Sequence, residues 1–312
     1  MTIRLGYQIP NYTYPNSPVE QLFDTVVAQA REAEASGFDT VLVMDHFYQL
    51  PGIGPAENAM LECYTTLAAL ASATSTVRLS ALVTGNTYRN PALLAKTVTT
   101  LDVVSAGRAI LGLGAGWFEK EHHEYGFEFG TFSQRFERLE EALGIIAPML
   151  RGETPTFSGA WYRVENALNN PRLRPTIPIM LGGGGERKTF RLAARFADHM
   201  NVICDREYIP RKVAAVRQRC EEAGRDPASL ATSYLASVML TESEEAARAV
   251  LDVVPPERLR RVFIGTPESV AESLQGDVLD QGIDGLVVNM VLNGHEPGVV
   301  ALAGQTLLPL VS

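Results

Sequence analysis

Cysteine is scarce in this sequence, and its three copies lie far apart. Cys63, Cys204 and Cys220 form no CxxC pair, and three is an odd number. A disulfide framework usually needs an even set of cysteines, and a structural zinc site needs ligands at short, regular spacings. The sequence therefore predicts neither, and its cysteine content fits a reducing cytoplasm.

Positive charge and long apolar runs are also lacking. Lys and Arg number 27 against 36 Asp and Glu, so the formal net charge is -9. Binding to a nucleic-acid backbone needs a concentrated excess of positive charge. No run approaches the roughly 18 apolar residues of a membrane span, and Met1 to Tyr7 lack the apolar core of a signal peptide. We expect a soluble, cytoplasmic protein with no nucleic-acid and no membrane partner.

Short apolar runs alternate with longer segments of helical period along the 312 residues, which is typical of a parallel sheet covered by helices. Eight runs are expected to form strands: 3–8, 38–44, 77–83, 108–113, 177–181, 199–203, 231–240 and 283–289. Eight such units predict the α/β class and one (β/α)8 TIM barrel over residues 1–312. Insertions are expected near 117–132 and 152–176.

The capping residues of two expected helices support this count. Asn90 and Pro91 are a favoured start and Gly107 a favoured stop for one helix, and Thr266 starts another that ends at Gly282. The rival architecture, a doubly wound sheet, carries its glycine-rich loop after the first strand, where residues 5–10 contain none. The barrel is therefore preferred.

Catalytic residues of a barrel lie at the carboxyl ends of its strands, and Asp45-His46 ends the second one. A strand terminus that meets solvent would explain this pair, but a His at the mouth can also donate or accept a proton near neutral pH. Thr84, Gly85 and Asn86 follow the third strand. They offer hydrogen bonds and close backbone approach, and turn formation explains them equally well.

Glycines follow the next two strands. Gly112, Gly114 and Gly116 before Trp117 either allow a tight exit from the barrel or open space for a planar ring beside the indole. The run Gly182, Gly183, Gly184 and Gly185 precedes a helix expected to begin near Glu186. Free backbone N–H groups at a helix N-terminus favour phosphate, although a flexible loop is the alternative.

A further cluster, Glu121-His122-His123-Glu124, contains metal-ligating residue types but not the HExxH spacing that places two ligands on one helix face. Adjacent residues on a helix point about 100° apart. We therefore expect a solvated helix face here and no metal site.

Several of these segments, in order along nearly the whole chain, resemble the luciferase-like monooxygenase superfamily and its coenzyme F420-dependent oxidoreductase branch. The matching segments are 101–102 with 105–108, 111–117, 45–47, 88–91, Arg135 with 139–141, 182–185, 224–227 and 265–268. The resemblance implies a barrel that binds the deazaflavin in its mouth with the phosphate-bearing tail outward. It also implies a cis peptide in strand three, near Ala81-Leu82.

By position, the resemblance assigns His46 as the proton donor, Asp45 as a cofactor contact and Thr84 as a ring contact. It assigns the phosphate side of the cofactor to residues 182–185, and cofactor binding also extends to Gly85, Gly114, Gly116 and Trp117. Sugar-phosphate dehydrogenases of the family carry a catalytic Glu where this sequence has Trp117. A sugar-phosphate substrate is therefore not expected, and neither Glu119 nor Glu121 can be assigned that role from sequence.

Three functions follow from these residues. The first is F420-dependent hydride transfer to or from a small organic substrate, with His46 supplying or removing the proton. The second is a monooxygenase that uses reduced FMN, and the third is a cofactor-binding protein without catalysis. Aromatic residues in the two insertions favour an apolar or planar ligand, packing or a dimer contact, and we expect a homodimer.

Overall fold

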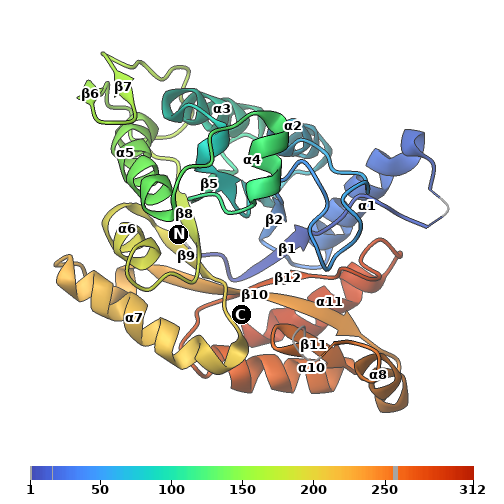
Figure 1. Cartoon of the computed structure of the whole chain (residues 1–312). Coiled ribbons are helices and arrows are strands. Elements are labelled where there is room, and N and C mark those ends of the chain that lie inside the picture. The colour runs from blue at the N-terminus through green and yellow to red at the C-terminus, as the bar shows by residue number, and fades with distance from the viewer. Residues whose placement is uncertain (1, 16, 256–258) are drawn as a thin grey trace.

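Eight parallel strands close into a barrel in the computed structural model, which describes residues 2–15, 17–255 and 259–312 (Figure 1). The barrel strands are β1 (Leu5–Ile9), β2 (Thr40–Val43), β3 (Arg78–Ala81), β5 (Ala109–Gly114), β8 (Ile179–Gly183), β9 (His199–Val202), β10 (Ala231–Leu240) and β12 (Leu286–Asn289). Closure follows because β1 pairs with both β2 and β12, and β10 pairs with both β9 and β12. The predicted (β/α)8 fold is confirmed.

Helices follow the barrel strands and pack outside them (Figure 1). They are α1 (Val19–Ala35), α2 (Cys63–Ala73), α3 (Pro91–Val104), α5 (Phe132–Leu150), α6 (Thr189–Phe196), α7 (Ile209–Glu222), α10 (Pro267–Leu274) and α11 (Val299–Leu307). The predicted caps are confirmed: the Asn90 side chain accepts from the amides of Ala92 and Leu93, and that of Thr266 from Ser269. Gly107 adopts a φ of 90° after α3.

Two apolar cores result from the alternation of side chains along the strands. The larger core lies between the barrel and its helices, and a smaller one fills the barrel interior with Ile3, Leu42, Leu82, Ile110, Met180 and Val287. Gly112 belongs to the interior side, where an added Cβ would lie 1.9 Å from the backbone oxygen of Ala81. Any side chain at this position would push β5 away from β3.

The remaining elements lie in the segments that connect these units. Both expected insertions contain structure: the first contains α4 (Glu119–Tyr125), and the second contains the hairpin of β6 (Phe157–Ser158) and β7 (Arg163–Val164). A short β4 (Thr84–Gly85) follows β3 and pairs with β5. The sequence did not predict a third insertion, which contains α8 (Glu244–Leu251) and β11 (Val262–Gly265). β11 pairs with the carboxyl-terminal residues of β10 and so adds a strand to the sheet.

Two expectations near the barrel mouth need correction. Gly182 and Gly183 belong to β8 and pair with Asn201 and Val202, so only Gly184 and Gly185 lie in the connection, and α6 begins at Thr189. The glycines extend the strand because β9 offers a partner for each. The non-proline cis peptide joins Leu82 and Val83, one residue later than expected.

The motif around Arg108 serves the opposite end of the barrel. Its guanidinium donates to the backbone oxygens of Ala71 and Thr74 at the end of α2, and to those of Val77 and Ser105. These bonds satisfy carbonyls that the end of α2 leaves unpaired. One of the segments that carried the resemblance therefore stabilises the fold.

In the part of the chain that the structure describes, no helix has the length and apolar character needed to cross a membrane.

His199 is a fully buried histidine of the barrel interior whose pKa is strongly lowered. Its Nε2 lies 2.8 Å from Oγ of Ser233, and its Nδ1 has no partner among the described residues. Burial, followed by the positive charge of Arg78, lowers the pKa of His199 to about 3. The folded protein therefore holds a neutral imidazole.

This buried imidazole predicts a specific loss of stability in acid. The unfolded chain takes up a proton as the pH falls through about 6.5, whereas the folded chain does not until about pH 3. His199 should therefore reduce the free energy of unfolding by about 2 kcal/mol between roughly pH 7.5 and pH 5. Urea denaturation of the wild type and His199→Gln at both pH values measures this difference. An identical loss in both proteins would contradict the assignment.

Candidate functional site

Loops after β2, β3 and β5 bring the predicted mouth residues together. The backbone amide of Gly85 donates to Asp45, the hydroxyl of Thr84 lies 2.7 Å from that of Tyr64, and the rings of His46 and Trp117 are 5.6 Å apart. Apart from Tyr64, which lies in α2, these residues come from three different strand ends, as a barrel site requires.

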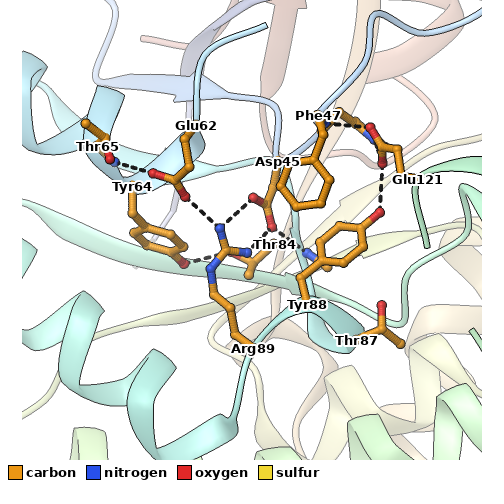
Figure 2. A network of polar contacts seen from close by, with 12 residues as sticks. Asp45, Phe47, Glu62, Tyr64, Thr65, Thr84, Thr87, Tyr88, Arg89 and Glu121 are labelled. Carbon is orange, nitrogen blue, oxygen red and sulfur yellow. Dashed lines mark hydrogen bonds and ion pairs between the residues drawn. The ribbon is translucent and has the colours of Figure 1, made fainter. Parts of the chain in front are cut away.

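A buried ion pair organises one side of this mouth (Figure 2). Both oxygens of Asp45 accept from the guanidinium of Arg89, at 2.6 and 2.9 Å, and one also accepts from Gly85. Burial lowers the pKa of Arg89, but Asp45 outweighs this effect and raises the pKa above its usual value. Asp45 thus ties the end of β2 to the loop after β3, and its contact with a cofactor stays a prediction.

The expectation of a solvated face at residues 121–124 is wrong for its first two residues. Glu121 and His122 are fully buried, whereas His123 and Glu124 are exposed. The Glu121 carboxylate reaches back to the end of β2, with Oε2 2.9 Å from Nδ1 of His46. A glutamate that sequence reasoning could not assign therefore contacts the predicted proton donor directly.

Four groups surround the carboxylate of Glu121. Oε1 accepts from the amides of Phe47 and Tyr48, and Oε2 accepts from the hydroxyl of Tyr88 besides facing His46 (Figure 2 shows the bonds to Phe47 and Tyr88). Burial raises the pKa of Glu121, but His46 and the other donors outweigh it and hold the pKa below its usual value. Glu121 is therefore a carboxylate at neutral pH.

His122 is buried for a different reason. Its Nδ1 lies 2.8 Å from the backbone oxygen of Phe118, and its Nε2 lies 2.6 Å from Oγ1 of Thr87. Burial lowers the pKa of His122. The residue therefore anchors α4 to the loop after β3 as a neutral ring. Across residues 2–15, 17–255 and 259–312, no three His, Cys, Asp or Glu side chains are placed to hold a metal ion.

The strand-end glycines mainly allow close packing. A Cβ on Gly114 would lie 2.8 Å from Val83, and one on Gly182 would lie 2.7 Å from the same side chain. Gly116 has a φ of 79°, and a Cβ there would lie 2.6 Å from Oγ1 of Thr87. The tight-exit interpretation thus accounts for Gly114 and Gly116, and their contact with a cofactor stays a prediction.

Trp117 is an exposed aromatic residue of the first insertion that lies beside the predicted proton donor. Phe127 packs against Phe47 and Tyr88, whereas 60% of Trp117 is exposed beside His46 and Phe118. The first insertion therefore leaves one indole at the mouth free to meet a ligand.

The phosphate contact expected of the glycine loop stays a prediction. Gly184 and Gly185 precede α6, whose first turn has no side-chain cap. Lys212 donates to the backbone oxygen of Gly184 and to the carboxylate of Glu186, so an ion pair lies beside the loop. An anion bound to the free amides of this turn would gain from the helix dipole as well.

Buried amide side chains lie near the carboxyl ends of β4, β9 and β12, and the sequence analysis named only one of them, Asn86. The side-chain oxygens of Asn86, Asn201 and Asn289 are buried, and no donor among the described residues reaches them. A buried acceptor without a partner is costly, so such atoms point to water or a ligand. No local pattern marks Asn201 and Asn289, because their burial arises from barrel closure.

The model of the luciferase-like monooxygenase family matches residues 3–277. The chain therefore belongs to this family.

Two curated relatives and one solved structure are similar to this chain. A protein of Nakamurella multipartita named F420-dependent glucose-6-phosphate dehydrogenase is 31% identical over 98% of this chain and 96% of its own length. One of the same name from Microbacterium testaceum is 32% identical over 72% of this chain, which spans 64% of that relative. The structure of an F420-dependent secondary alcohol dehydrogenase has a TM-score of 0.83 at 20% identity, with complete coverage of both chains.

The Asp45–Arg89 pair predicts a sharp contrast between two carboxylates that share one guanidinium. Asp45→Asn should lower the free energy of unfolding by about 3 kcal/mol, because it leaves a largely buried arginine without its buried charge partner. Glu62→Gln, which alters the exposed partner of Arg89, should cost under about 1 kcal/mol. Chemical denaturation of both variants measures the two effects, and equal losses would contradict the scaffold role of Asp45.

Proposed function

We propose that this protein is a coenzyme F420-dependent oxidoreductase that transfers a hydride between the deazaflavin and a small organic substrate, while His46 gives or takes the accompanying proton. The pairing of His46 with the buried carboxylate of Glu121 at the barrel mouth carries the proposal. The names of the two curated relatives support the choice of coenzyme.

The residues present fit such a cofactor. A deazaflavin, when bound, supplies a two-electron hydride donor or acceptor at C5 of its ring. Its ring also has N–H donors, which the unpartnered amide oxygens of Asn86, Asn201 and Asn289 can accept. Gly184 and Gly185 before α6 would hold the phosphate of its tail, with Lys212 alongside.

His46 is equipped to move a proton in either direction. Glu121 occupies its Nδ1, so Nε2 is the nitrogen left for a substrate, and it has no hydrogen-bond partner among the described residues. In the reducing direction, the imidazolium gives its Nε2 proton to the substrate atom that becomes a hydroxyl or amine. In the oxidising direction, neutral imidazole takes that proton.

The substrate we propose is not a sugar phosphate. Trp117 stands where the family's sugar-phosphate dehydrogenases have a glutamate, and its exposed indole lies against His46 and Phe118. This wall favours an apolar or planar substrate group through buried aromatic surface. A carbonyl or alcohol flanked by such a group fits both Trp117 and the proton exchange at His46.

Titration of the purified protein with coenzyme F420, and separately with FMN, tests the cofactor. We expect a saturable change in the absorbance or fluorescence of F420 and a much weaker response with FMN. Tight FMN binding without any F420 response would overturn the proposal and favour a reduced-FMN monooxygenase. Saturable F420 binding without turnover across alcohols, ketones and glucose 6-phosphate would favour a binding protein without catalysis.

Replacement of His46 tests the proton transfer. His46→Gln should retain F420 binding and lower kcat by on the order of 10² to 10⁴. His123→Gln is the matched control, because His123 lies exposed on α4 and faces Glu119. Unchanged turnover in His46→Gln would rule out His46 as the proton donor.

A further inference from the structure

The two oxygens of Glu121 have separate partners. Oε1 accepts only from backbone, at 2.6 Å from the amide of Phe47 and 3.0 Å from that of Tyr48. Oε2 faces side chains, at 2.9 Å from Nδ1 of His46 and 2.7 Å from the hydroxyl of Tyr88. One oxygen therefore fixes the chain just after His46, and the other fixes the imidazole ring itself.

The surroundings keep this carboxylate charged and dry. Glu121 is fully buried, and the side chain of His46 is only 14% exposed. Tyr88 packs against Phe47 at a centroid distance of 4.8 Å, which closes one side of the carboxylate. Six other charged or titratable side chains lie near the pair. Asp45 and Arg89 bind each other, and the remaining four are Tyr48, Lys120, His122 and Glu124.

We infer that Glu121 is the positioning residue for His46: its Oε2 accepts the Nδ1 proton and so selects the imidazole tautomer that leaves Nε2 bare toward the mouth. A buried carboxylate cannot donate a hydrogen bond, so a neutral His46 facing it must carry its proton on Nδ1. A charge-assisted bond of this kind favours that tautomer by about tenfold or more. The catalytic meaning of this role rests on the proposed function, whereas the tautomer does not.

Replacement by glutamine separates this role from a merely structural one. In Glu121→Gln, the amide oxygen can keep the bonds to Phe47 and Tyr48, and the amide nitrogen then takes the place of Oε2. That nitrogen donates, so it favours the opposite tautomer of His46, with the proton on Nε2. If Glu121 only held the backbone of residues 47–48, this substitution would leave the tautomer unchanged.

Nitrogen-15 NMR of histidine-labelled protein, without cofactor or substrate, measures the tautomer. His46→Gln identifies the His46 signals among the five histidines. We expect the Nδ1–H form in the wild type and the Nε2–H form in Glu121→Gln, with wild-type behaviour in Glu119→Gln, whose exposed carboxylate faces His123. A predominant Nε2–H form in the wild type, or an unchanged tautomer in Glu121→Gln, would overturn the inference.

The wild-type spectrum decides the point even if Glu121→Gln fails to fold. Where a substrate is known, Glu121→Gln should lower kcat by about 100-fold or more with little change in KM, as expected for a wrong tautomer of a catalytic histidine. A normal kcat in a protein with the inverted tautomer would refute the positioning role. If the wild type shows the Nδ1–H tautomer but no response to F420, the proposed function alone would be refuted.

Discussion

Closure of the barrel is the constraint on which the rest of the structure depends. The first strand, β1, pairs with the last strand, β12, as well as with β2. The carboxyl ends of all eight barrel strands therefore form one rim. Closure in turn requires that side chains be absent where strands approach most closely. Gly112 against Ala81 is the clearest case, because a single added carbon would strike the neighbouring backbone.

Two buried carboxylates then turn the rim into a site. Asp45 and Glu121 both act on the segment that follows β2, one from within that segment and one from α4, and each has its own cationic or polar partners. Burying such charges is costly unless every lone pair is used, and here backbone amides supply part of each set. The result is a fixed setting for His46, which suits the proton-transfer role that we propose for it.

The barrel itself was predictable because its signals are local. Apolar runs marked all eight strands, and the caps at Asn90 and Thr266 gave helix starts correctly. The family resemblance added the cis peptide to within one residue. The hairpin of β6 and β7 lay inside an expected insertion. β11 was missed, although its partner residues 237–240 of β10 lie within the strand expected over 231–240.

The site was predictable only in part. His46 could be found from its place at a strand end, whereas Glu121 could not. Glu121 lies in α4, which has only seven residues, and its burial results from contacts with Tyr88 and with the segment after β2. The same holds for the amide oxygens of Asn201 and Asn289, which become isolated only once the barrel closes. Periodicity within a short helix carries too little information to separate a solvated face from a buried one.

A crystal structure of the protein with coenzyme F420 tests the central claim most directly. The account predicts the ring at the carboxyl ends of the strands, on the side where Nε2 of His46 and the indole of Trp117 lie, with the phosphate at Gly184 and Gly185. A ring bound elsewhere, or one from which His46 points away, would contradict it.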